Sequence, residues 1–265
     1  MILLLLLFVI SGCLAHNIRD RVVRQKYGVA EGVYFSHWPM EQKLEHEVET
    51  IVKAFGKEHF KKPQNAFLDQ ETGGYIEEIC GEKVHINQTV ATIMNAEPDT
   101  LVWPVVVVLE PEISVEVYRS IRVCKSSFQT WFGGGGRGHN IRLAAQSINN
   151  YLLAPGELFS FNRATGPRTS ERGYQQAPII VGGSVVPGYG GGVCQVSSTL
   201  YNTVKKADLE IVERFPHSRP VDYVPRGRDA TVSDFLDFKF RNNTEEYLLI
   251  KTSAYNFHLV IELWH

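Results

Sequence analysis

The sequence has almost no excess of charge. Its 27 lysines and arginines nearly balance its 29 aspartates and glutamates, which leaves a formal net charge of −2 at pH 7. Binding to nucleic-acid phosphates requires a concentrated basic surface, so we expect no nucleic-acid partner. The densest group of basic residues is Arg214, Arg219, Arg226 and Arg228. These arginines would either bind carboxylates of an acidic peptide or form solvated surface.

Motifs for metals and cofactors are also missing. No pair of cysteines or histidines has the short spacing of a structural zinc site. The glycines of Gly190–Gly192 are not followed by the Lys-Ser or Lys-Thr of a phosphate-binding loop. We expect no metal and no cofactor.

The hydrophobic run at the N-terminus is short. Met1–Ile10 is apolar throughout but is too short to span a bilayer. Together with Ser11-Gly12-Cys13 it is typical of a secretory signal ending in a lipobox, and cleavage before Cys13 would leave that thiol lipid-modified. No Lys or Arg precedes the run, and a misassigned start or cleavage after Ala15 would also explain the pattern. We expect an extracytoplasmic protein, either a membrane-anchored lipoprotein or a secreted one.

Cysteine is scarce, with four in the chain. When Cys13 is set aside, an odd number remains. In an exported protein this favours a disulfide between Cys80 and Cys124 and a free reactive thiol at Cys194. The alternative is that all three stay reduced and buried, because the sequence does not give the distance between the first two.

Cys194 follows a run of glycines at the start of an expected helix. Val193, Val196, Leu200 and Val204 recur at helical spacing and predict a buried stripe, with Cys194 in the first turn beside it. The positive end of the helix dipole stabilises a thiolate there. We expect Gly191 and Gly192 to let a substrate backbone and oxyanion-binding amides come close. A buried cysteine after a tight turn is the alternative.

A candidate base for this thiol comes some two dozen residues later. The segment 209–215 is strand-like, Pro216 ends it, and His217 follows. A cysteine on a helix and a histidine at the end of a strand form a common catalytic arrangement.

Several motifs in a fixed order resemble the VanW domain, and they cover more than half of the chain. They are Ser126–Phe128, Asn140–Ala145, Pro155–Asn162, Gly166–Thr169, Gly190–Asn202, His217–Ser218, Gly227–Thr231 and Asp237–Phe240. The preceding segment is similar to the peptidoglycan-binding domain that often comes before a VanW domain. Its shorter signals are Pro63–Phe67, Gly73–Tyr75, Gly81–Val84 and Pro104–Val108.

The resemblance implies work on the bacterial cell wall. Some VanW proteins are understood to act as cysteine L,D-transpeptidases, and the family's cysteine and histidine fall on Cys194 and His217. The resemblance thus implies that peptidoglycan stem peptides are cross-linked through a Cys194 thioester. A thiol carboxypeptidase or endopeptidase, or a non-catalytic wall-binding protein, are the alternatives.

Further site residues are expected around this pair. Asp229 is the first choice for orienting His217, with Asp222 and Tyr223 as alternatives; Asp229 would otherwise cap a turn or pair with Arg228. The expected substrate-binding residues are an arginine for the terminal carboxylate, an amide near the oxyanion and their neighbours: Arg168, Gln195, Ser197, Arg228, Gly191 and Gly192.

The expected fold is α+β, with two domains because the chain is longer than one typical domain. The boundaries are a signal and lipobox segment at 1–13, a linker at 14–40, a peptidoglycan-binding module or spacer at 41–122 and a VanW domain at 123–265. In the last, the cysteine-bearing helix would pack on a mainly antiparallel sheet.

Periodicity and turn signals predict the elements inside these domains. We expect helices over 41–55 and from Asn140 onward, with Gly133–Gly136 as a lid or a surface loop. Hairpins are expected over 66–76 and over 237–252 with its turn at Asn242-Asn243, and an apolar stretch with a Gly182-Gly183 turn is expected over 175–186.

Overall fold

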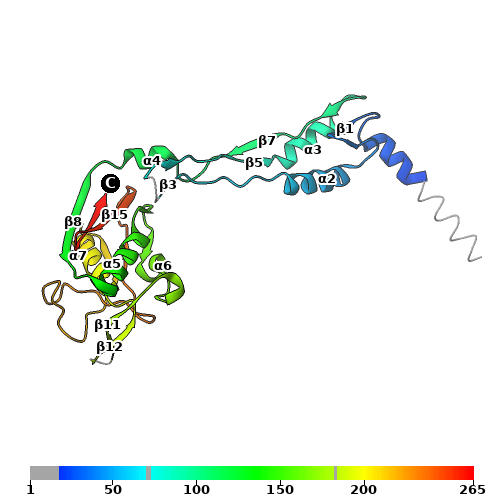
Figure 1. The fold of residues 1–265 in the computed structure, drawn as a ribbon. Coiled ribbons are helices and arrows are strands. Elements are labelled where there is room, and N and C mark those ends of the chain that lie inside the picture. The colour runs from blue at the N-terminus through cyan, green and yellow to red at the C-terminus, as the bar shows by residue number, and fades with distance from the viewer. Residues whose placement is uncertain (1–17, 70–72, 182–183) are drawn as a thin grey trace, which may run out of the picture. The chain divides into compact units, whose positions relative to one another are not determined.

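The computed structural model describes residues 18–69, 73–181 and 184–265 and has an α+β fold, as the sequence predicts (Figure 1). It divides into two compact units. Unit 1 contains the described residues through Phe67 together with Glu77–Ser114, and unit 2 contains Leu68–Ile76 and Val115–His265. The expected signal and lipobox segment 1–13, including Cys13, lies outside the described residues. Every helix in the described part of the chain is too short or too polar to cross a membrane.

Unit 1 is built from helices and short strands. A helix over residues 18–27 is part of it. The elements that follow are β1 (Tyr34–Phe35), β2 (Trp38–Pro39), α2 (Glu45–Glu58), β5 (Gly81–Val84), α3 (Ile86–Met94), β6 (Leu101–Val102) and β7 (Val106–Leu109). Strands β5 and β7 pair antiparallel, and β1 lies between β2 and β6.

Residues 29–40, which were expected to be a linker, pack into the core of unit 1. Val33, Phe35 and Met40 are fully buried there and contact the apolar faces of α2 and α3. The helix that the amphipathic pattern predicts over 41–55 therefore supplies only part of the core of this unit. A short segment with irregular spacing carries no periodic signal, although its apolar side chains fill the same core.

The two cysteines expected to form a disulfide are free thiols. Cys80 lies in unit 1 and Cys124 in unit 2, and both are exposed. The Cys80 thiol donates a hydrogen bond to Glu110 at 3.4 Å, and the Cys124 thiol donates one to the Ser126 carbonyl at 3.5 Å. Counting cysteines was therefore misleading, because an odd number does not place any two of them together.

Unit 2 is centred on a four-stranded antiparallel sheet in the order β8-β16-β15-β9. Its strands are β8 (Cys124–Trp131), β9 (Tyr151–Leu153), β15 (Leu248–Tyr255) and β16 (His258–Trp264). Helix α7 (Val193–Lys206) packs against β8 and β16, and helix α5 (Gly135–Ile148) packs against β15 and α7. The cysteine-bearing helix thus lies on an antiparallel sheet, as predicted.

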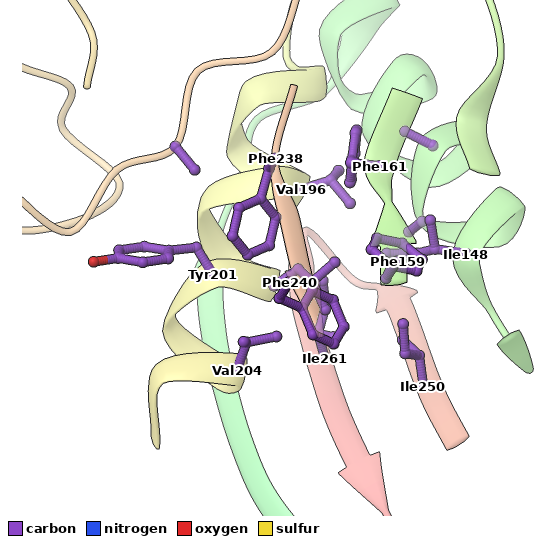
Figure 2. Packing of buried hydrophobic residues seen from close by; sticks show 14 of the residues in the cluster. Ile148, Phe159, Phe161, Val196, Tyr201, Val204, Phe238, Phe240, Ile250 and Ile261 are labelled. Carbon is purple, nitrogen blue, oxygen red and sulfur yellow. The ribbon is translucent and has the colours of Figure 1, made fainter. Parts of the chain in front are cut away.

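A second antiparallel sheet joins β10 (Leu158–Ser160), β14 (Lys239–Arg241) and β13 (Glu210–Glu213), with β14 in the middle. Its aromatic side chains complete the core between the helices and the first sheet (Figure 2). The rings of Phe159 and Phe240 lie 5.0 Å apart, and Tyr201 of α7 meets Phe238 edge-on at 5.7 Å. These aromatic contacts fix α7 against the second sheet.

The hairpin expected over 237–252 does not form, because β14 and β15 belong to different sheets. The reason lies in Asn242, which is fully buried instead of exposed at a turn. Its side-chain amide donates to the carbonyls of Leu153, Ala154 and Glu246. These bonds hold the segment as a crossover between the two sheets.

The hairpin predicted over 66–76 is present, with strands β3 (Phe67–Leu68) and β4 (Tyr75–Ile76) paired. The apolar stretch expected over 175–186 forms β11 (Gln176–Val181) and the first part of β12 (Ser184–Tyr189), and these two strands pair antiparallel. The expected Gly182-Gly183 turn lies outside the described residues. The remaining elements are two short α-helices and a 3₁₀ turn: α4 (Val115–Ser120), α6 (Phe161–Thr165) and η1 (Ser170–Arg172).

Helix α5 begins five residues before the predicted start at Asn140, so much of Gly133–Gly136 is not a loop or lid. Asn140 does not cap the helix but lies fully buried inside it, where its side chain links α5 to other segments. Its side chain donates to the carbonyls of Gln175 and Gly191 and accepts from the Gln175 amide. These hydrogen bonds connect α5 to the segment that leads into α7.

Candidate active site

Cys194 is the second residue of α7, in the position that the glycine run predicts. Gly192 is the N-cap, with a left-handed φ of 103°, and the helix continues to Lys206. The Cys194 side chain is half-buried, and its thiol donates to the Val232 carbonyl at 3.4 Å. The thiol therefore lies at the positive end of the helix, where the backbone dipole favours a negative charge.

The two glycines before Cys194 serve close packing of the backbone. A Cβ atom on Gly191 would lie 2.6 Å from the Pro178 carbonyl oxygen, and one on Gly192 would lie 2.9 Å from Cγ of Arg137. Gly191 is buried, and its carbonyl accepts the hydrogen bond from Asn140. We expected these residues to open a path for substrate, but the space above them is filled by this protein's own β11 and α5.

His217 lies beside Cys194 although 23 positions separate them in the chain. The segment after β13 forms an isolated bridge between Phe215 and Thr231, and the histidine follows it. Its ring makes a side-chain hydrogen bond with Cys194 and, through Nδ1, a 2.7 Å contact with Asp229 Oδ2. Because Nδ1 is engaged by Asp229, Nε2 is the nitrogen left for the thiol.

The three groups shift one another's protonation. Burial of the ring lowers the pKa of His217, but the hydrogen bond and charge of Cys194, and then those of Asp229, outweigh it and place the pKa above the ordinary 6.5. Burial raises the pKa of the Asp229 carboxyl, and the hydrogen bonds from His217 reverse this effect, so the pKa lies below 3.8. A carboxylate paired with an imidazolium is the state that these shifts favour.

Helix α7 also holds the segment that carries Asp229. Ser197 donates to the Ala230 carbonyl at 2.6 Å, and Ser198 accepts from the Ala230 amide at 2.9 Å. Asn202 donates to the Arg228 carbonyl at 2.6 Å. One helix thus places the thiol directly and, through these polar side chains, the carboxylate that orients the histidine.

Ser197 and Gln195, which were expected to contact substrate, are fully buried. Ser197 uses its hydroxyl on the Cys194 and Ala230 carbonyls. The Gln195 amide donates to Thr130 and to the Trp131 carbonyl, and its oxygen accepts from Arg137. Both side chains are therefore engaged within the protein and hold the helix in place.

Two expected substrate-binding arginines are engaged elsewhere. The Arg168 guanidinium donates to Asn162 at 2.6 Å and, at 3.5 Å, to Thr165 and to the Ser233 carbonyl. Arg228 is exposed and reaches Asn202 at 3.4 Å. Arg168 therefore links neighbouring segments of this protein. Sequence alone does not distinguish such an arginine from one that binds substrate.

The structure adds Arg137, which sequence reasoning missed, and gives contacts to Arg214 and Tyr223. Arg214 donates to the Asp229 carbonyl at 2.6 Å and to its carboxylate at 3.1 Å. Tyr223, weighed only as an alternative partner of His217, places its ring 6.5 Å from the histidine ring and makes a side-chain hydrogen bond with Ser198. Arg137 lies over the Tyr223 ring at 5.8 Å. The basic cluster in the sequence included Arg214 without singling it out, and no sequence signal marked Arg137.

Metal binding has no candidate in the described part of the chain, where no group of three or more His, Cys, Asp or Glu side chains is arranged to hold an ion. Asp222, the other alternative partner of His217, is exposed. The groups that the structure brings together at this site are the Cys194 thiol, the His217 imidazole and the Asp229 carboxylate. Such a cluster supports nucleophilic attack by sulfur with proton transfer through the ring.

Comparison with known proteins agrees with the sequence motifs. A family model described as VanW like protein matches residues 136–264. The uncharacterized protein YoaR of Bacillus subtilis is 37% identical over 222 residues, which are 81% of this chain and 73% of that protein. The vancomycin B-type resistance protein VanW of Enterococcus faecalis is 33% identical over 112 residues, which are 40% of this chain and 41% of that protein. No solved structure matches the chain.

Proposed function

Because this chain belongs to the VanW-like family and is for that reason a cell-wall-related protein, we propose that it is a cysteine acyl transferase. Its substrates are the stem peptides of peptidoglycan, and its reaction is L,D-transpeptidation. The observation that carries this proposal is the contact of Cys194 with His217, which Asp229 holds from the other side.

The first half-reaction forms a thioester. The Cys194 sulfur attacks the carbonyl carbon of the third stem residue as an anion, its proton having passed to His217. The amide bond to the fourth residue breaks, and the imidazolium returns the proton to the leaving amine. The released product is a free D-amino acid, and Asp229 stabilises the imidazolium while it exists.

The second half-reaction consumes the thioester. The amine of a neighbouring stem attacks the acyl carbon, passes a proton to His217, and leaves a new amide bond between the stems. The thiolate departs and is reprotonated. Water in place of the amine would make the protein a carboxypeptidase or endopeptidase, which the products distinguish.

Location follows from the same proposal. Stem peptides lie outside the cytoplasmic membrane, so the protein would act there, either secreted to the cell wall or held by a lipid on Cys13. Unit 1 would bind peptidoglycan or act as a spacer. Mass analysis of the mature N-terminus tests the lipid anchor, because a lipoprotein would begin at a Cys13 that carries acyl chains, whereas a protein cleaved after Ala15 would begin at residue 16 without them.

Intact-protein mass spectrometry tests the acyl-transfer step. The full chain is incubated with a defined tetrapeptide muropeptide, with and without an acceptor stem. We expect one acyl adduct per protein, lost in Cys194→Ala and retained in Cys80→Ala and Cys124→Ala, which remove exposed thiols elsewhere. An unchanged mass in all samples, with muropeptide bound, would identify a non-catalytic wall-binding protein.

A further inference from the structure

We propose that Arg137 binds the terminal carboxylate of the donor peptide, the role that the sequence assigned to Arg168. This inference rests on the proposed function, because that carboxylate belongs to the residue released in the first half-reaction. Arg137 lies in a glycine-rich stretch at the start of α5, and no motif drew attention to it. Its contacts with α7 and with Tyr223 carry the inference.

Arg137 is held against the beginning of α7 from three directions. Its aliphatic stem lies over Gly192, where an added Cβ would come within 2.9 Å of Cγ. Its guanidinium donates to Gln195 Oε1 at 2.7 Å and lies over the ring of Tyr223. Gly192 and Gln195 flank the Val193-Cys194 start of α7, and Tyr223 interacts with the charges of both Cys194 and Arg137, so the cation and the thiol share this neighbour.

Among the described residues, Arg137 is a half-buried cation without a carboxylate partner. Its recorded hydrogen bond goes to a neutral amide and uses one of five N–H donors. Arg214, by comparison, is paired with Asp229 at 3.1 Å. Partial removal of a cation from water is costly unless an anion offsets it, and a substrate carboxylate would supply that anion.

The neighbouring phenol leaves the positive charge of Arg137 uncompensated. Burial raises the pKa of Tyr223, and the negative charge of Cys194 raises it further, whereas the hydrogen bond with Ser198 and the charge of Arg137 only reduce the rise. The Tyr223 phenol is therefore neutral at neutral pH. Its ring face supports the guanidinium through a cation–π contact and leaves the outer donors for a ligand.

The chemistry of the donor peptide fits this placement. In a tetrapeptide donor, the fourth residue carries a free carboxylate one carbon away from the scissile amide nitrogen. A group that holds this carboxylate must therefore lie close to the sulfur that attacks the neighbouring carbonyl. An arginine suits the task because its planar fork matches both carboxylate oxygens.

Binding without catalysis gives the first test. The Cys194→Ala protein is titrated calorimetrically with a tetrapeptide whose fourth residue ends in a carboxylate, and with the same peptide ending in a carboxamide. We expect the carboxylate form to bind roughly tenfold or more tightly. Adding Arg137→Gln should remove this preference, and Arg137→Lys should restore part of it.

Arg142→Gln is the matched control, because Arg142 is exposed on the same helix and lies over Phe132 and Phe257 instead of Tyr223. It should keep the preference for the carboxylate. A thermal melt checks that the Arg137→Gln protein is folded. If this folded variant prefers the carboxylate peptide as strongly as the protein with Arg137 does, the assignment is wrong.

Acylation of the protein with an intact thiol separates this inference from the proposed function. If Arg137 binds the carboxylate, Arg137→Gln raises KM for the acid peptide and leaves acylation by the carboxamide unchanged. An acyl adduct that forms equally well from both peptides in wild type and variant contradicts the role of Arg137 and leaves acyl transfer in place. Absence of any adduct, with the binding preference intact, contradicts acyl transfer alone.

Discussion

Oδ2 of Asp229 accepts two hydrogen bonds from one residue, His217: from the backbone N–H at 2.6 Å and from ring Nδ1 at 2.7 Å. The double contact fixes both the main chain and the ring plane of the histidine. Arg214 completes the carboxylate's partners at its other oxygen. The ring is therefore oriented before any substrate arrives, with Nε2 toward Cys194.

Replacing Asp229 with Asn should slow acylation of Cys194 about 100-fold or more, because the amide neither stabilises the imidazolium nor fixes the useful tautomer. The rate is measured by intact mass after mixing with a tetrapeptide donor. Asp222→Asn is the control, since Asp222 is exposed on the same loop, and it should acylate at the wild-type rate. Equal rates in the two variants would remove Asp229 from the catalytic machinery.

The three described cysteines should react at different rates with iodoacetamide at neutral pH. The hydrogen bond with Glu110 and then burial raise the pKa of Cys80, and burial raises the pKa of Cys124, so both are mostly thiols. Cys194 lies beside a histidine whose pKa is raised and should be labelled first. Peptide mapping of partly labelled protein gives all three rates in one sample.

His217→Gln should slow labelling of Cys194 about tenfold or more and leave the rates of the other two cysteines unchanged. Cys80 and Cys124 therefore act as internal controls for protein folding and reagent concentration. An unaltered Cys194 rate in the variant would show that the imidazole does not activate the thiol.

The sequence allowed prediction of α7 and of the places of Cys194 and His217 in the chain, for identifiable reasons, whereas Asp229 was expected because its segment matches a motif of the family that the chain resembles. The valine and leucine stripe from Val193 to Val204 is periodic, and glycines before a cysteine mark a helix start. A proline after a strand-like run placed His217 at a strand end. Each of these signals is local, so it survives without knowledge of the rest of the fold.

The remaining features depend on contacts between distant segments. Ser198 and Asn202 look like the solvated side of α7, yet both are buried, because their polar atoms bond the 228–230 segment. Buried polar groups that are satisfied leave no trace in hydrophobic periodicity. Asn140 and Asn242 misled for the same reason, since asparagine signals caps and turns when it is considered alone.

The pKa of His217 offers a test of the electrostatics. It should lie above 6.5 in the wild-type protein and fall in Cys194→Ala and in Asp229→Asn. In the double variant only burial is left, so the pKa should lie below 6.5. NMR titration of the ring protons measures it. A double variant with a pKa still above 6.5 would mean that another anion near the ring had been overlooked.

The same shifts give a pH dependence of stability. Because the folded pKa of His217 is raised, its contribution is fully present below 6.5 and is lost as the pH rises through the folded value. The pKa of Asp229 is lowered, so its contribution is present above 3.8 and is lost as the pH falls through the folded value. Urea unfolding of wild type and His217→Gln should differ most on the acid side of neutrality and converge in mild alkali.

Gly192 should tolerate a side chain poorly. Its φ of 103° is strained for any residue with a side chain, and a Cβ there would meet Arg137 Cγ at 2.9 Å and Ile141 Cγ1 at 3.1 Å. Gly192→Ala should therefore lower the free energy of unfolding by about 1–3 kcal/mol, measured from urea midpoints. It should also shift Arg137 away from Tyr223 and weaken binding of the carboxylate peptide. Gly133→Ala, where an added Cβ meets nothing within 4 Å, should change neither property, and a Gly192→Ala protein as stable as this control would show that the N-cap tolerates a side chain.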